Sequence, residues 1–157
     1  MFRDVVRFKQ KLSEEECRQV LREGKRGVLA LAGDDGYPYT VPINHWYNDE
    51  DGKLYFHSGA SGHKIDAIRA CDKASFCVID RGESRGDWSL YFKSVVVFGR
   101  VRIIEDHEWA LEISRRLSRK FIQDEEYIER EIRNSGGRVL CFVLEPEHIT
   151  GKLVHES

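Results

Sequence analysis

Short apolar runs separated by glycine-rich or charged turns dominate the chain, and most of these runs have the composition of β-strands. Strands are predicted at 26–33 (RGVLALAG), 37–47 (YPYTVPINHWY), 53–58 (KLYFHS), 73–80 (KASFCVID), 88–105 (WSLYFKSVVVFGRVRIIE) and 138–146 (RVLCFVLEP). Pro38 and Pro42 cannot donate ladder hydrogen bonds, so the second strand should lie partly at a sheet edge or carry a bulge. The run at 88–105 is longer than a typical strand, which predicts a bend or bulge near Gly99.

Helical signals occur at four places between these runs. Ser13 and Glu16 fit a capping box that opens a helix reaching Gly24. A short helix is predicted in 63–72 (HKIDAIRACD). Asp106 and Asp124 can each cap a further helix, the first running to about Lys120 and the second ending at NSGG, 134–137. The apolar positions predicted to face the core are Cys17, Val20, Leu21, Ile65, Ile68, Trp109, Ile113, Leu117 and Phe121.

The order of elements is therefore helix, three strands, short helix, two strands, two helices and a last strand. Turns of hairpin length join most neighbouring strands, which favours an antiparallel sheet closed into a small barrel with helices packed outside it. A doubly wound parallel sheet would need strands and helices to alternate throughout, and here they do not. Since no repeat, low-complexity segment or linker is found, residues 1–157 are predicted to form one domain.

Composition narrows the class of protein further. Of 157 residues, 41% are hydrophobic and 33% charged, as in a soluble globular protein, and the net charge of −2 gives no global basic field for nucleic acid. No stretch approaches a membrane helix, and the charged start has no signal-peptide core. Cys17, Cys71, Cys77 and Cys141 form no C-x-x-C pair and no zinc-like spacing with histidine, so we expect a cytoplasmic protein with free thiols and no metal site.

The stretch YFHSGASGHK, residues 55–64, carries the strongest candidate chemistry. A strand end, a glycine-containing loop and a helix start supply the groups that a phosphate needs: hydroxyls, close backbone N–H groups and a cation. The residues concerned are His57, Ser58, Gly59, Ser61, Gly62, His63 and Lys64. Lys64 is the strongest candidate, because the helix dipole disfavours a lysine there unless an anion compensates. The alternative is a solvated polar turn; the spacing of a P-loop is absent.

Three segments together resemble the pyridoxamine 5′-phosphate oxidase-like, FMN-binding split-barrel superfamily: YPYTVPINHWY, GKLYFHSGASGHKIDAIR and YFKSVVVFGRVRIIED. The branch that they resemble most is the one named for nitroimidazole-resistance proteins. The resemblance runs from about Arg26 to Lys152 and includes ITGK, 149–152. It implies an antiparallel split β-barrel, mainly β with peripheral helices, that usually forms a homodimer with FMN in grooves at the interface.

The resemblance also implies which residues bind the cofactor. The phosphate loop corresponds to His57, Ser58, Ser61 and Lys64, and the strand beside the flavin ring to Val41, Pro42, Ile43 and Asn44. Lys93 and Ser94 stand where relatives place polar groups near the flavin. The oxidase itself prefers arginine and glutamine there, and its C-terminal substrate-binding segment has no counterpart, which argues against pyridoxamine phosphate oxidase activity.

Several alternatives stay open from the sequence. His57 can be a ligand contact or a hydrogen-bonded structural histidine, whereas His45 more simply closes its strand. Trp46, Trp88 and Trp109 fit core or dimer contacts better than ring stacking. For function, a flavin-dependent oxidoreductase with a small-molecule acceptor such as a nitroaromatic stands beside a non-catalytic protein that binds FMN, FAD, haem or a deazaflavin. A barrel that has lost its ligand and acts only as a dimer is disfavoured by Lys64 and its serines.

Overall fold

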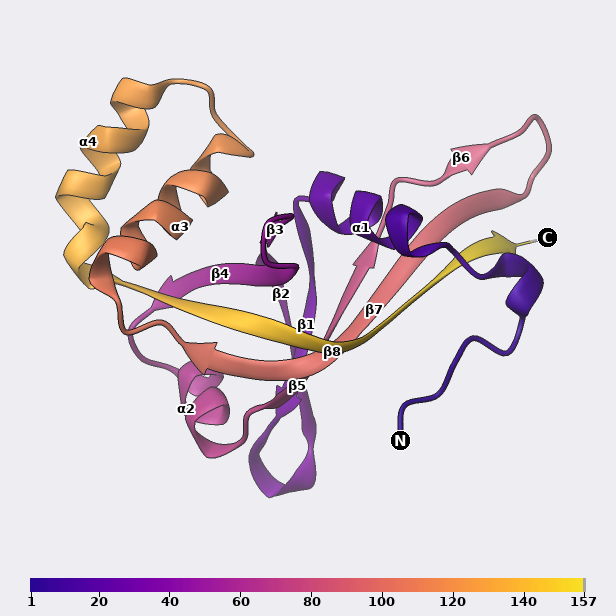
Figure 1. The fold of residues 1–157 in the computed structure, drawn as a ribbon, viewed down its shortest axis with the longest axis horizontal. Coiled ribbons are helices and arrows are strands. Elements are labelled where there is room, and N and C mark those ends of the chain that lie inside the picture. The colour runs from indigo at the N-terminus through magenta and orange to yellow at the C-terminus, as the bar shows by residue number, and fades with distance from the viewer. Residues whose placement is uncertain (157) are drawn as a thin grey trace.

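The computed structural model describes residues 1–156, with the side chains of residues 1–155. In this part of the chain eight strands form one antiparallel sheet, in the order β2-β1-β5-β7-β8-β4-β3, with β6 added to β7 (Figure 1). The strands are β1 (Arg26–Ala32), β2 (Pro38–Asn44), β3 (Trp46–Asn48), β4 (Lys53–Gly59), β5 (Lys73–Ile79), β6 (Glu83–Ser84), β7 (Leu90–Ile103) and β8 (Val139–Glu156). The sheet curls until β2 and β4 touch without pairing, which confirms the predicted split barrel.

Four helices lie around the barrel in the described residues: α1 (Glu14–Glu23), α2 (His63–Ala70), α3 (His107–Arg119) and α4 (Glu125–Ser135). Short 3-10 turns occupy Phe8–Gln10, Asp34–Gly36 and Gly136–Arg138. Helix α1 packs against β3, β5, β7 and β8, α2 lies beside β1 and β7, and α3 covers β4 and β8 with α4 outside it (Figure 1). None of the helices among residues 1–156 is both long and apolar enough to cross a membrane.

Two apolar clusters hold these layers together. Inside the barrel, the rings of Phe56 and Phe142 stack at 4.9 Å between centroids and Phe76 meets Phe56 edge-on, while the apolar side of α1 closes the cluster. Under α3, Tyr55 packs with Trp46 and Trp109 at 5.3 and 5.4 Å between ring centroids. Burial of this apolar surface is the main force that fixes α1 and α3 on the sheet.

Several local predictions are confirmed. Ser13 and Glu16 form the capping box of α1, with both hydrogen bonds at 3.1 Å. The strand with Pro38 and Pro42 lies at one edge of the sheet, where missing N–H donors are tolerated. The long strand β7 shifts register between Phe98 and Gly99, at the predicted bulge.

Other predictions need correction. The last strand runs to Glu156 instead of ending at Pro146, because the predicted tail pairs with the first half of β7. The predicted strand 37–47 is divided into β2 and β3 at His45, whose N–H donates to the carbonyl of Lys25. Phe121 lies beyond the end of α3 and is exposed, so it does not continue the buried stripe. Trp88 is exposed on the loop between β6 and β7, which excludes the core contact expected for it, while the dimer contact stays a prediction.

Candidate functional site

A hollow of about 430 Å³ lies at the seam of the barrel, where β2 and β4 meet. Its walls are formed by Arg26, Pro42, Ile43, Asn44 and His57. Strand β2 pairs on one side only, and the last four residues of β4 pair only with β8. Backbone groups along this seam are therefore not used by the sheet, and they can serve a ligand in the hollow.

The pleat of β2 decides which of its side chains reach this hollow. Pro42 and Asn44 lie opposite Val28 and Arg26 of β1, on the outer face of the barrel. Val41 and Ile43 have the other orientation and pack against the barrel core, although Ile43 also borders the hollow. A ligand at the seam would therefore meet the side chains of Pro42 and Asn44. Val41 lies opposite Leu29, in the same alternation as the bonded pairs Gly33–Tyr37 and Lys25–His45, so its backbone pairs with β1. The backbone groups of Pro42 and Asn44 are the ones that face the open side of β2.

The loop between β4 and α2 has the open geometry that a phosphate requires. Gly62, at the N-cap of α2, has φ of 124°, and no side chain caps the helix. A Cβ atom on Gly59 or Gly62 would meet no atom within 4 Å, so space lies in front of both residues. The hydroxyls of Ser58 and Ser61 have no hydrogen-bond partner among the described protein groups. The first helical turn therefore has N–H groups without a side-chain cap, and the two serine hydroxyls in the same loop are free to bind a ligand.

The electrostatics of this loop favour an anion. Lys64 is half-buried and forms no ion pair with any carboxylate among residues 1–155, and its burial lowers the pKa of the ammonium group. Loss of water around the ring lowers the pKa of His57, and the charge of Lys64 lowers it further. A bound phosphate would compensate the Lys64 charge and accept hydrogen bonds from the nearby donors. The residues present therefore fit the phosphate of a flavin nucleotide.

His63 has a structural position in the same loop. Its ring stacks on Tyr39 of β2 with 4.0 Å between centroids, and its Nε2 lies 3.8 Å from a carboxylate oxygen of Asp34. These contacts join the start of α2 to the β1–β2 turn. They place the loop against β2, and so bring the candidate phosphate site next to the seam.

Lys93 and Ser94 are neighbours on β7 and therefore point to opposite faces of the sheet. Ser94 faces outward, where it borders a hollow of about 410 Å³ with Val96, Thr150 and Lys152. Lys93 points toward α1, and its Nζ lies 3.7 Å from a carboxylate oxygen of Glu16. The structure thus places Ser94, but not Lys93, on the outer face that carries Pro42 and Asn44. Three strand spacings separate Asn44 from Ser94, about 14 Å.

Arg26 is a site residue that the sequence analysis missed. It is exposed at the start of β1, directly opposite Asn44, and makes no ion pair within the described chain. The signal was available in RGVLALAG, because alternation along this strand puts Arg26 and Val28 on the face away from the buried Leu29.

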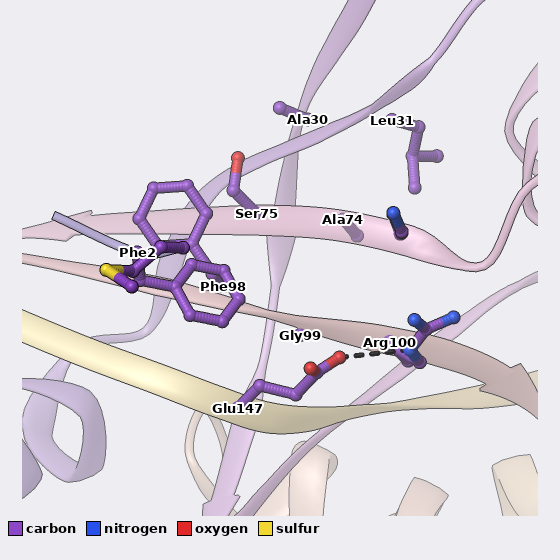
Figure 2. A pocket seen from close by; sticks show the side chains of 11 residues that line it. Phe2, Ala30, Leu31, Ala74, Ser75, Phe98, Gly99, Arg100 and Glu147 are labelled. Atoms are coloured by element: carbon purple, nitrogen blue, oxygen red, sulfur yellow. Dashed lines mark hydrogen bonds and ion pairs between the residues drawn. The ribbon is translucent and has the colours of Figure 1, made fainter.

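The hollow in Figure 2 lies elsewhere on the outer face and holds none of the predicted cofactor residues. There the N-terminal segment crosses the sheet, and the rings of Phe2 and Phe98 lie 5.5 Å apart. Arg100 and Glu147 form an ion pair at 3.0 Å beside them (Figure 2). Phe2 also stacks on His148, so these contacts anchor the N-terminal segment to β7 and β8.

The strand order and the open seam define an antiparallel split β-barrel, with the candidate residues at the seam and on its outer face. The chain belongs to the pyridoxamine 5′-phosphate oxidase family, whose model matches residues 13–153. This match confirms the superfamily indicated by the three sequence segments.

Solved structures share this fold. A candidate 5-nitroimidazole antibiotic resistance protein from Bacteroides thetaiotaomicron superposes with a TM-score of 0.75 at 19% identity, covering 92% of this chain and 87% of its own. A conserved hypothetical protein from Mycobacterium tuberculosis superposes with a TM-score of 0.80 at 16% identity, covering 96% of this chain and 90% of its own. A FAD-binding protein from Mesorhizobium loti superposes with a TM-score of 0.66 at 29% identity, covering 92% of this chain and 97% of its own. No curated protein sequence gives a significant match.

Proposed function

We propose that this protein is a flavoprotein that binds FMN at the seam of its barrel. The observation that carries the proposal is the half-buried Lys64 at the open start of α2, which has no carboxylate partner in residues 1–155 and lies close enough to His57 to lower its pKa. Such a cation is stabilised by a bound phosphate. The hydroxyls of Ser58 and Ser61 and the N–H groups at the helix start complete the phosphate site.

The strand residues at the seam and His57 would hold the rest of the flavin. Pro42 and Asn44 would hold the flat ring against the outer face, and the free backbone groups of these two residues would bind its polar edge. His57 is neutral near pH 7 because its pKa is lowered, so it donates or accepts one hydrogen bond without adding charge. When bound, the flavin supplies the electron-transfer chemistry, while the protein binds and orients it.

The reaction that we propose is electron transfer from reduced flavin to a small acceptor, such as a nitroaromatic compound. The family match and the likeness to the Bacteroides protein support this choice. A second candidate is a non-catalytic protein that binds FMN or another cofactor for storage or sensing. The likeness to the Mesorhizobium protein, described as FAD-binding, favours keeping this candidate and FAD as the alternative flavin.

We further propose that the protein acts as a cytoplasmic homodimer, with the flavin near the interface. The outer face of the sheet has an uncharged row across neighbouring strands, formed by Pro42, Val28, Cys77, Val96 and Thr150. Val28 is 44% exposed there, and Ile79 nearby is 59% exposed. A second copy of this face would cover that apolar surface.

Substitution of Lys64 tests the phosphate site. Since one charge-assisted hydrogen bond is lost, Lys64→Ala should weaken FMN binding about 10- to 100-fold, measured by fluorescence titration of the apo-protein. The matched control is Lys9→Ala, which removes an exposed lysine outside every hollow that touches the candidate residues. Equal FMN affinity in the Lys64 variant and the wild type would contradict the proposed site.

Enzymatic assays separate the two candidate functions. The reductase should oxidise NADH or NADPH faster when a nitroaromatic acceptor is added to the yellow, flavin-loaded protein. A storage or sensing protein would keep its flavin absorption and show no acceptor-dependent oxidation. A colourless protein that takes up no flavin on titration would contradict both.

A further inference from the structure

A second hollow, of about 550 Å³, adjoins the seam at the C-terminal end of α1. Arg26 borders both hollows, so they meet at this side chain. The volume lies in the range of small-molecule sites and exceeds what a single inorganic anion requires. Its lining residues are Gln19, Val20, Glu23, Gly24, Lys25, Arg26, Ile79, Asp80, Arg81, Gly82 and Lys93.

The charges in this hollow are mostly positive and only partly neutralised. Lys25, Arg26 and Arg81 make no ion pair with a carboxylate anywhere in residues 1–155. Lys93 is already engaged with Glu16, at 3.7 Å. An anion that enters the hollow would therefore meet three cations without a carboxylate partner, of which Lys25 also lies over the ring of Phe121, with its Nζ 5.5 Å from the ring centroid.

The two carboxylates that line the hollow have other contacts. A carboxylate oxygen of Glu23 accepts a hydrogen bond from the side-chain amide of Gln19, at 3.1 Å. An oxygen of Asp80 accepts from the backbone N–H groups of Gly82 and Lys93, at 3.0 and 2.8 Å. Asp80 thus stabilises the turn after β5 and holds Arg81 at the rim of the hollow.

The hollow also offers apolar surface next to the cations. Ile79 ends β5 with its side chain on the outer face, 59% exposed, and Val20 of α1 contributes to the lining. Gly24 and Gly82 add lining without a side chain. A ligand that fits this combination has a flat or apolar part and at least one phosphate, which is the chemistry of a nucleotide.

We propose that this hollow binds the phosphorylated adenosine end of an adenine dinucleotide, with Lys25, Arg26 and Arg81 on its phosphates and Ile79 against its base. The proposal rests on the proposed flavin site, because Arg26 joins the two hollows. Two ligands carry such an adenosine end. One is FAD, through its adenylate half, and the other is a nicotinamide dinucleotide that reduces a bound FMN.

The test uses ADP as the probe. Isothermal titration of both the apo-protein and the FMN-loaded protein with ADP should show binding to at least one form. Arg81→Ala should weaken it on the order of 10-fold or more, as loss of a charge-assisted contact predicts. Lys25→Ala, on another element, should weaken it in the same direction. Arg133→Ala is the control, because Arg133 is an exposed arginine of α4 that makes no ion pair in the described chain.

Flavin and dinucleotide titrations then identify the source. If FAD is the ligand, it binds the apo-protein more tightly than FMN, and Arg81→Ala removes the difference. If a nicotinamide dinucleotide is the ligand, FAD and FMN bind equally, and Arg81→Ala raises KM for that dinucleotide while kcat stays unchanged.

The proposal is overturned if ADP binds neither form, or if Arg81→Ala and Lys25→Ala leave its affinity unchanged. Failure of the flavin site is recognised separately. In that case FMN does not bind, or binds equally well to Lys64→Ala, whereas the ADP titration of the apo-protein still reports on the second hollow.

Discussion

Two titratable side chains behind the seam show how single residues support the candidate site. His45 is fully buried, and its Nε2 donates to the carbonyl of Leu21 at 2.8 Å. Lys120 at the end of α3 donates to the carbonyls of His45 and Gly24. Burial lowers the pKa of His45 to about 4 and that of Lys120 to about 8. These contacts hold the chain at Gly24, two residues before Arg26, and at His45, directly after Asn44. Two residues that line the seam thus have a fixed neighbour.

His45 should make folding stability depend on pH. The histidine titrates near 6.5 in the unfolded chain and near 4 in the folded protein, so between these values the unfolded state binds the additional proton. The contribution of His45 to stability is therefore complete above about pH 6.5 and is lost as the pH falls toward 4, by roughly 3 kcal/mol at most. Urea unfolding at several pH values between 7 and 4 measures this slope.

His45→Gln provides the comparison, because its amide can still donate to the Leu21 carbonyl but does not titrate. This variant should have a pH slope that is smaller by about one proton in that window. His107→Gln, which changes an exposed histidine at the start of α3, should keep the wild-type slope. Equal slopes in all three proteins would show that His45 does not control acid stability.

At the scale of elements, the approach of α1 to the barrel depends on a glycine in ITGK. The N–H of Leu12 donates to the carbonyl of Gly151 at 2.9 Å, where the chain entering α1 crosses β8. A Cβ atom at position 151 would lie 2.6 Å from the Sγ of Cys17 and 3.0 Å from a methyl group of Leu12. The motif thus has a packing role, since a larger residue at position 151 would clash with Cys17 and Leu12 and displace α1 from the sheet.

Gly151→Ala should destabilise the fold by about 1–3 kcal/mol through overpacking. In the background of Cys17→Ala, which removes the closest atom, the same substitution should cost less, so the two changes should be non-additive. Gly137→Ala is the control, because a Cβ there would meet no atom within 4 Å. Additive free energies of unfolding for positions 17 and 151 would contradict this account.

The elements that could be predicted from the sequence are those whose signals are local. The capping box of α1 and the bulge at Gly99 depend on a few adjacent residues, and both are found. The loop at 57–64 is a candidate from the sequence because its residues are consecutive, and its role in binding stays a prediction. The extension of β8 to Glu156 depends on pairing with a distant strand, and the seam exists only because the whole sheet curls. The curl brings His57 of β4 beside Pro42 and Asn44 of β2, whereas Arg26 reaches the hollow through its local pairing with Asn44.

The opposite orientation of Lys93 and Ser94, unlike the strand pairing, could have been predicted from the sequence. Adjacent residues of a regular strand point to opposite faces, so the sequence already implied that both could not face one ligand. The resemblance to relatives placed both residues near the flavin, but the pleat of β7 directs their side chains to opposite faces of the sheet. The structure leaves Ser94 as the member that shares a face with Asn44.

For the molecule as a whole, the outer face of the sheet carries exposed apolar side chains between the N-terminal segment and the seam. Helix α3 covers the β4–β8 end with α4 outside it (Figure 1). Helices α1 and α2 pack on the inner cluster, so neither covers the outer side of β1 and β5. Exposed apolar side chains on that face include Val28, Ile79 and Phe98. The seam hollow opens beside the same face through Pro42 and Arg26, so a second copy docked there would also enclose a bound flavin.

Val28→Glu should therefore convert the proposed dimer to a monomer and weaken FMN binding together with it. Val28 lies between Pro42 and Cys77 in the uncharged row, so a carboxylate there would be buried without a partner in the dimer. Light scattering of the flavin-loaded protein measures the mass, and circular dichroism checks that the barrel is folded. Tyr127→Glu, on the exposed side of α4, should leave both the mass and the FMN affinity unchanged. A monomeric wild type with flavin bound would contradict the dimer, and a Val28→Glu protein that stays dimeric would place the interface on another face.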